Sequence, residues 1–131
     1  MLKLTKKLEY ALIALRHMHS KGEHLSSSKE IADTYIIPKE ILAKTLQQMA
    51  RLHYIEAVQG PSGGYKLKKK LAKISLTQFF EEIEGPIGIT DCIIDIDCIQ
   101  IGNCNIRQPI KEINHNIRSI FNKINLSQIT K

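Results

Sequence analysis

Residues 27–67 of the chain read SSKEIADTYIIPKEILAKTLQQMARLHYIEAVQGPSGGYKL and contain two helix signals followed by a hairpin signal. Ser27, with a glutamate three residues later, fits a capping box and predicts a short helix ending at Asp33. Pro38 stands where the first turn of a helix tolerates proline, and it predicts a second helix that ends near Leu52. Two helices of this size joined by a few residues predict a helix-turn-helix. The expected buried face of the second helix consists of Ile41, Leu42, Leu46 and Met49.

The end of the same stretch predicts a β-hairpin. Ile55–Val58 alternates and contains β-formers, Tyr65–Lys68 alternates apolar and basic residues, and residues 60–64 between them favour a tight turn. A hairpin directly after a helix-turn-helix is a wing. Its tip exposes backbone N–H groups, and the lysines after the tip, which elsewhere would be ordinary solvated charge, suit phosphate contacts here. These lysines are Lys66, Lys68, Lys69 and Lys70.

Apolar residues at helical spacing predict further helices on both sides of this stretch. One covers residues 5–20 with Thr5 as its N-cap, another covers residues 75–84 with Ser75 as its cap, and the last opens at Pro109. The last helix carries a narrow apolar seam, typical of a helix that packs along a partner helix. The seam consists of Ile110, Ile113, Ile117, Ile120, Phe121 and Ile124. We expect a mainly α fold with a small β-hairpin, divided into a winged helix-turn-helix domain (1–84), a cysteine loop (85–108) and a dimerisation helix and tail (109–131).

The net charge of +6 is unevenly distributed along the chain. Residues 1–80 contain 14 basic and 6 acidic side chains, whereas residues 81–97 contain six acidic side chains and no basic one. The basic portion suits a polyanion such as DNA. The acidic portion would be repelled by phosphates, so we expect it to face away from them.

The three cysteines of the chain, Cys92, Cys98 and Cys104, lie within thirteen residues. A disulfide framework normally uses an even number of cysteines. Three clustered thiols therefore indicate three ligands of one soft metal centre. Zinc is the main rival metal, although its structural sites usually have cysteines about two to four residues apart. A thiol-based redox switch and inert buried thiols are the other interpretations.

The N-terminus begins with basic residues and then turns apolar, as in a signal peptide, but Glu9 interrupts the apolar run and no small-residue cleavage site follows. We expect a cytoplasmic protein, in which reducing conditions keep the thiols free. No stretch approaches the ~20 apolar residues that cross a bilayer, so no membrane partner is expected. An enzyme is not expected either, because no phosphate-binding Gly-rich loop precedes a helix and no nucleophile–base pair is recognisable.

These features together resemble the winged-helix regulators of the IscR/NsrR/RirA type, bacterial transcription factors that respond to iron–sulfur clusters, nitric oxide and iron. The resemblance covers nearly the whole chain. The segment Glu84-Gly85-Pro86-Ile87 is most similar to members that regulate iron–sulfur cluster assembly. The pieces that carry the resemblance are Leu4-Thr5-Lys6 with Tyr10-Ala11, the wing Gly60-Pro61-Ser62-Gly63-Gly64-Tyr65, the three cysteines and the long last helix.

The resemblance implies a homodimer, a pseudo-palindromic double-stranded DNA operator, and an iron–sulfur cluster of the two-iron or four-iron form held by the three cysteines and a fourth ligand. In the cluster-assembly branch that ligand is a histidine, where this chain has Arg107, which is a very poor ligand. In the nitric-oxide-sensing branch it is an acidic residue in the first helix of the other subunit, and Glu9 occupies the matching position. Glu9 is equally well explained as a charge near the positive end of the helix dipole, and His115 and the weaker His24 are alternative ligands.

The helix from Pro38 to Leu52 is expected to read DNA rather than to serve only as a core helix with a solvated charged face. Glu40 could accept a hydrogen bond from a cytosine amino group. Gln59 stands where family members often have an arginine that enters the minor groove, so the operator is expected to differ. The residues expected to contact DNA are Ser28, Lys39, Glu40, Ala43, Lys44, Gln47, Gln59, Pro61, Ser62, Gly63, Tyr65 and Lys66.

The sequence therefore predicts a transcription regulator whose DNA affinity depends on an iron–sulfur cluster. The alternatives are a winged-helix repressor that uses zinc or a thiol switch without a cluster, and a small redox or metal protein that binds an acidic protein partner.

Overall fold

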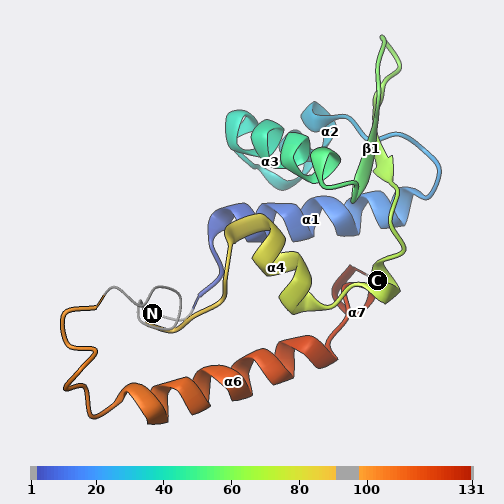
Figure 1. Cartoon of the computed structure of the whole chain (residues 1–131). Helices are drawn as coiled ribbons and strands as arrows, with labels where there is room; N and C mark the ends of the chain where they lie inside the picture. The colour runs from blue at the N-terminus through green and yellow to red at the C-terminus, as the bar shows by residue number, and fades with distance from the viewer. Residues whose placement is uncertain (1–2, 91–97, 131) are drawn as a thin grey trace.

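The computed structural model describes residues 3–90 and 98–130 of the chain. Helix α1 (Lys6–Lys21) lies in the middle of the molecule, with α2 (Ser28–Tyr35), α3 (Lys39–Arg51) and the hairpin of β1 (Ile55–Val58) and β2 (Gly64–Leu67) on one side (Figure 1). A 3-10 turn, η1 (Leu71–Lys73), then leads to α4 (Leu76–Glu84), α6 (Arg107–Lys123) and α7 (Ser127–Thr130) on the other side. This arrangement confirms the mainly α winged helix-turn-helix with a small hairpin. Within the described ranges, no helix is both long and apolar enough to span a bilayer.

Side-chain hydroxyls set the starts of α1, α2 and α4. Thr5, Ser27 and Ser75 each accept a hydrogen bond from the backbone N–H three residues later, at 3.2, 3.0 and 3.0 Å. Such a bond satisfies one of the donors that a helix start leaves free. Gly22 and Gly85, both with positive φ, follow the ends of α1 and α4. The predicted boundaries of these two helices are therefore confirmed.

Other predicted boundaries differ from the structure by a few residues. Helix α2 continues to Tyr35 rather than ending at Asp33, because no helix breaker intervenes before Ile36 takes a left-handed conformation with φ of 55°. Pro38 is the N-cap residue of α3 and lies just before it. Helix α6 begins at Arg107, two residues before the expected start, since proline is tolerated throughout a first turn whose N–H groups have no partner.

The core lies on both sides of α1. Ala11 and Ala14 are fully buried, and such small side chains let neighbouring helices approach α1 closely. Three of the four residues predicted for the inner face of α3 are fully buried, but Ile41 is 44% exposed. The prediction for Ile41 was wrong because the buried row of α3 runs along residues 42, 45, 46 and 49, and position 41 lies beside this row.

The chain returns to the core after α6, which the sequence did not predict. Helix α6 ends at Lys123, so Ile124 lies beyond the helix whose seam it was expected to extend. Leu126 is fully buried, and its backbone N–H donates to the Ile74 carbonyl at 2.9 Å. Helix α7 then contacts α1 and η1. The C-terminal tail therefore packs against the same core as the N-terminal helices.

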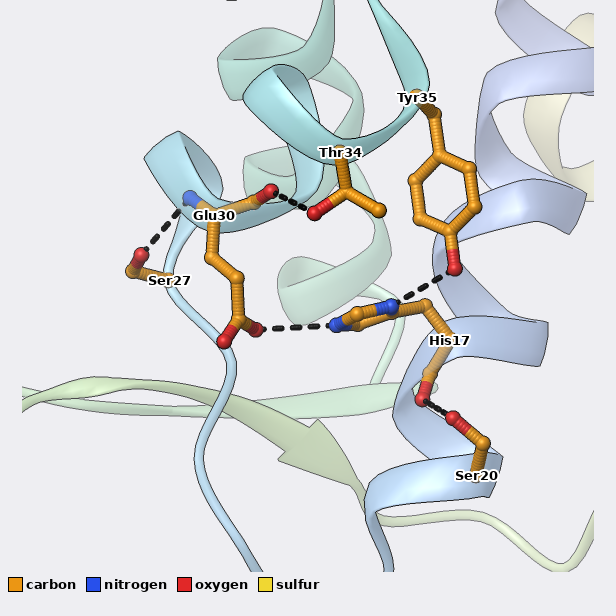
Figure 2. Close-up of polar contacts among 6 residues, drawn as sticks. All are labelled: His17, Ser20, Ser27, Glu30, Thr34 and Tyr35. Carbon is orange, nitrogen blue, oxygen red and sulfur yellow. Dashed lines mark hydrogen bonds and ion pairs between the residues drawn. The ribbon is translucent and has the colours of Figure 1, made fainter.

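One histidine connects α1 to both ends of α2 (Figure 2). His17 of α1 is buried, and its Nε2 lies 2.9 Å from a carboxylate oxygen of Glu30 in the first turn of α2. Its Nδ1 lies 2.8 Å from the hydroxyl of Tyr35, the last residue of α2, and the two rings meet edge to face. The hydrogen bond from His17 lowers the pKa of Glu30 below its ordinary value of 4.5. The carboxylate is therefore stabilised in the folded state.

The Glu30 pKa predicts how acid affects stability. A lowered pKa in the folded state gives stability that is fully present above pH 4.5 and is lost as the pH falls through the folded value. Glu30→Gln should therefore cost no more than about 1 kcal/mol at neutral pH, because the Glu30 side chain is partly exposed. The difference in the free energy of unfolding between Glu30→Gln and wild type should become smaller at acidic pH.

Urea unfolding between pH 3 and pH 7 would measure the effect. Glu40→Gln is the matched control, since Glu40 is exposed and pairs with no other side chain among the described residues. A difference between wild type and Glu30→Gln that stays constant over this range would contradict the role of the Glu30 charge.

Candidate nucleic-acid interface and cysteine loop

The outer face of α3 presents a row of polar side chains. Lys39, Glu40, Lys44 and Gln47 are exposed and Ala43 is half-buried, while the opposite face lies in the core. Positions three and four apart lie on one side of a helix, so Glu40, Lys44 and Gln47 are neighbours. No other side chain of the described ranges holds any of the four exposed ones by a hydrogen bond or ion pair. The predicted contact residues of α3 are thus brought together and are available to a ligand.

The wing is a regular antiparallel hairpin in which Ala57 pairs with Tyr65 and Val58 with Gly64. Gln59, Pro61 and Ser62 at its tip are exposed, as a DNA contact would require. At position 63, a Cβ atom would lie 2.1 Å from the Val58 carbonyl oxygen, so the turn accepts only glycine there. The hairpin Ile55–Val58 and its turn are confirmed, with β2 beginning one residue earlier than predicted.

The wing is joined to the start of α2. Ser26 and Tyr65 exchange two backbone hydrogen bonds, at 2.9 and 2.8 Å, and form an isolated antiparallel bridge. Gly64 lies so close to this crossing that a Cβ atom would meet the Ser26 carbonyl oxygen at 2.8 Å. Because Ser28 is two residues beyond the bridge, the structure brings the predicted contact residues Ser28 and Tyr65 to the same region.

The lysines after the wing tip do not form one group. Lys66 pairs with Glu23 at 3.2 Å, and the ammonium group of Lys69 lies 4.1 Å from the centre of the Tyr54 ring. Lys68 and Lys70 are exposed. The sequence did not indicate the first two contacts, because each involves a residue of another segment.

The last turn of α4 contacts several different elements. Glu81 pairs with Arg118 of α6, and Glu82 accepts a hydrogen bond of 2.6 Å from the hydroxyl of Tyr54 at the base of the wing. The Ile83 carbonyl accepts from Gln48 of α3 at 3.1 Å, and Glu84 accepts from Thr5 at the start of α1 at 2.8 Å. This turn therefore connects α1, α3, the wing and α6, and it leads through Gly85 directly into the cysteine loop.

Tyr54 and Glu82 form a partly desolvated polar pair. Burial raises the pKa of Tyr54 well above its ordinary range, and the carboxylate of Glu82 raises it further. Burial opposes the charge of Glu82, but hydrogen bonds from Tyr54 and Gln78 hold its pKa below the ordinary value. The pair therefore remains a neutral hydroxyl donating to a carboxylate near neutral pH. The sequence did not indicate this pair, because Tyr54 and Glu82 lie 28 residues apart in different segments.

The described part of the cysteine loop contains two of the three predicted sulfur ligands. Cys98 and Cys104 are half-buried free thiols, and Cys92 lies outside the described residues. The Ile101 N–H donates to the Cys98 carbonyl at 3.1 Å, which folds this segment into a turn. Free thiols of this kind are the ligands that both iron–sulfur clusters and zinc take. These two sulfur donors are of the type that such a group needs, but the described residues do not bring three metal-binding side chains together.

The candidate fourth ligands lie on two helices and a loop. Glu9 in the first turn of α1 is partly exposed, and its carboxylate pairs with Lys6 at 2.9 Å. Arg107 is exposed at the start of α6, and the side chains of His24 and His115 are also exposed. Within the single chain that the structure describes, the closest partner of Glu9 is therefore a lysine and not a thiol.

An apolar cavity of about 580 Å³ lies beside the end of α4. Its walls come from the start of α1, from α4, from the first residues of the cysteine loop and from α6. Among the residues that line it are Leu4, Leu8, Phe80, Ile87, Ile120 and Phe121. Ile120 is also 57% exposed, so the cavity is continuous with the outer surface of α6.

Comparison with known proteins gives matches over nearly the whole chain. Residues 4–131 match the family model Rrf2, described as an iron-dependent transcriptional regulator. Over 113 residues the chain is 29% identical to Protein aau3 of Rhizobium meliloti (strain 1021), covering 85% of this chain and 73% of that protein.

The solved structures of similar fold include CymR (YrzC), the global cysteine regulator of B. subtilis, with a TM-score of 0.76 and 22% identity over 99% of this chain and 97% of that one. They also include IscR of T. potens, with a TM-score of 0.72 and 19% identity over 96% of this chain and 84% of that one. At these identities the likeness concerns the fold.

Proposed function

The chain belongs to the Rrf2 family of transcriptional regulators, and on that premise we propose that it is a homodimer whose binding to operator DNA depends on the chemical state of its cysteine loop. Membership of this family confirms that the chain is a regulator and not an enzyme, as the sequence predicts. The observation that carries the proposal is the exposed row on α3, which is followed in the chain by a wing with an exposed tip.

We propose that α3 enters the major groove and that the wing contacts the adjacent backbone. Lys39, Glu40, Ala43, Lys44 and Gln47 face the base edges, where Lys44 and Gln47 have the hydrogen-bonding groups to read them. Ser28 at the start of α2 and Lys66 on the wing contact phosphates, which position the protein on the duplex. Gln59, Pro61, Ser62, Gly63 and Tyr65 of the wing complete the interface.

Removing one side chain of the α3 row tests DNA reading. Lys44→Ala should weaken binding about tenfold on a duplex that the wild-type protein selects from a random library, since a base contact is worth about 1–3 kcal/mol. Fluorescence anisotropy at fixed salt measures the affinity. Lys111→Ala is the matched control, because Lys111 is exposed on α6, away from α3 (Figure 1). Equal losses for both variants would mean that only net charge matters and would sink the assignment of α3.

The outer side of α6 supports a homodimer. Ile106, Ile113 and Ile120 are 57%, 48% and 57% exposed and are spaced by seven residues, so they line up along one side of the helix. The adjacent side of α6 packs on α4, where Phe121 meets Phe80 edge to face. A row of half-exposed isoleucines continuous with an apolar cavity is the surface that an identical helix from a second copy would cover.

Charged substitutions in this row of isoleucines should dissociate the dimer into monomers. A double variant with Ile113→Glu and Ile120→Glu places buried charges in the interface, so sedimentation equilibrium should give the 14.9 kDa mass of one chain where wild type gives twice that mass. Asn116→Glu, on an exposed polar part of the same helix, should leave the mass of wild type unchanged. Retention of the dimer by the double variant would place the interface elsewhere.

We propose that Cys92, Cys98, Cys104 and Glu9 of the partner subunit hold an iron–sulfur cluster. The supporting observations are the three clustered cysteines, the two free thiols in the described part of the loop, and a Glu9 carboxylate whose partner is a largely exposed lysine. An ion pair of that kind contributes little stability and is readily exchanged. When bound, a cluster would supply sensitivity to oxygen, nitric oxide and iron shortage. The iron-dependent description of the family and the fold shared with IscR favour it.

The last turn of α4 is the proposed route from the loop to the DNA-reading elements. A change in the loop at Gly85 pulls on a turn whose Ile83 carbonyl holds Gln48 of α3. The same turn holds the base of the wing through Glu82 and Tyr54. The state of the loop thereby biases the position of α3 and the wing together.

The cluster makes a spectroscopic prediction. Anaerobically purified protein should be brown, with iron and sulfide in equal amounts, and Cys92→Ala, Cys98→Ala or Cys104→Ala should each remove most of the visible absorbance while leaving a folded dimer. Glu9→Ala should change the spectrum or shorten the lifetime of the cluster. Lys6→Ala, which removes the partner of Glu9 but no ligand, should leave the spectrum as in wild type.

A colourless protein after anaerobic reconstitution with iron and sulfide would disprove the cluster. The cysteines would then belong to a zinc site or a thiol switch, an alternative with the same fold as the cysteine regulator CymR. Metal analysis of that colourless protein would separate zinc from a thiol switch.

A further inference from the structure

The contact between α1 and α2 has a chemistry that ordinary core packing does not need. His17 is 5% exposed, and its neighbours along α1, Ala14 and Met18, are buried apolar residues. Its ring lies between the two helices with both nitrogens directed at α2 (Figure 2). Glu30 is reached at 2.9 Å and Tyr35 at 2.8 Å. A leucine would fill this space without holding either partner.

The chemistry of the three side chains fixes which atom donates in each of the two hydrogen bonds. A carboxylate can only accept, so Nε2 of His17 donates to Glu30, and the Nδ1 of a neutral ring then accepts from the Tyr35 hydroxyl. Both bonds lie in the plane of one rigid ring and therefore fix two points of α2 relative to α1. Glu30 lies in the first turn of α2 and Tyr35 is its last residue. Rotation or sliding of α2 on α1 would break at least one bond.

The position of α2 decides where α3 begins. Only residues 36–38 separate the two helices, and Ile36 and Pro38 restrict this link through a left-handed φ of 55° and a proline ring. Lys39 and Glu40, which begin the exposed row, follow immediately. At the other end of α2, Ser28 lies beside the wing through the bridge of Ser26 with Tyr65.

We propose that His17 is a positioning residue for DNA reading, which sets the entry of α3 and the start of α2 by holding Glu30 and Tyr35. This inference rests on the proposed function, since it assumes that α3 and the wing bind operator DNA. According to this inference, His17 contributes to the sequence specificity of DNA binding although it touches no DNA. Because the Glu30 side chain and the Tyr35 residue are each about two-fifths exposed, water can replace either bond at small cost to folding. The main effect of the two hydrogen bonds is therefore to orient α2 relative to α1.

Substitutions of graded severity test this role. Tyr35→Phe removes one hydroxyl, His17→Gln keeps an amide that can donate to Glu30 but loses the bond with Tyr35, and His17→Leu removes both bonds. Thr34→Ala is the matched control, because Thr34 is exposed on α2 and its hydroxyl donates only to the Glu30 carbonyl within the same helix (Figure 2). The affinity of each variant is measured on the selected duplex and on an unrelated duplex of equal length, together with the urea unfolding midpoint.

We expect a loss of discrimination rather than a general loss of binding. Tyr35→Phe and His17→Gln should lower affinity for the selected duplex about threefold to tenfold, and His17→Leu should lower it more than tenfold. Affinity for the unrelated duplex, which depends on charge, should stay within a factor of two. Thr34→Ala should match wild type on both.

Two results would overturn the proposal. One is unchanged discrimination in folded Tyr35→Phe and His17→Gln, and the other is a loss on both duplexes that only follows the unfolding midpoint. If wild type itself binds no duplex selectively, the proposed function fails first. Hydrogen exchange then still tests whether His17 holds α2 in place. His17→Leu should speed exchange of the α2 amides relative to those of α3, and unchanged exchange would reject this role of His17.

Discussion

Burial of α1 on two sides is the constraint on which the rest of the structure depends. One side of the helix carries α3 and the wing strand β2, and the other carries α4 and the C-terminal helix α7. The fully buried Ala11 and Ala14 leave room for these neighbours to approach the α1 backbone. Any of these four elements that moves must therefore move against α1. This makes the first helix a common reference for the DNA-reading half and the cysteine-loop half of the molecule.

The features that short sequence patterns predict well are those that depend on neighbouring residues. The caps at Thr5, Ser27 and Ser75, the hairpin turn and the apolar row of α3 are all set within a few positions. The sequence could not predict the pairing of His17 with α2 or of Tyr54 with Glu82, because each joins segments brought together only by folding. Helix α7 was missed for a related reason. It is only four residues long and is stabilised by contacts with α1 and η1.

The glutamates at the end of α4 illustrate the same difference. Read as charge, these glutamates are groups that DNA phosphates would repel. In the structure, Glu81, Glu82 and Glu84 each hold a donor from another element. Arg118 neutralises the charge of Glu81, whereas Glu82 and Glu84 accept from neutral hydroxyl groups. All three contacts connect the last turn of α4 to its surroundings. A residue count alone gives the sign of a surface but not whether its charges are already paired.

The pairing of Lys66 with Glu23 changes what the wing does before DNA arrives. The side chain of Lys66 is about two-thirds shielded, and that of Glu23 is almost completely exposed. A phosphate that binds Lys66 must therefore replace a carboxylate that the protein itself supplies, and the freed Glu23 then faces the solvent. Binding at this point is an exchange of anions, so its net gain is smaller than that of an unpaired lysine. Because Glu23 is almost completely exposed, this competition is weak, and it lowers the attraction between the wing and a polyanion only slightly.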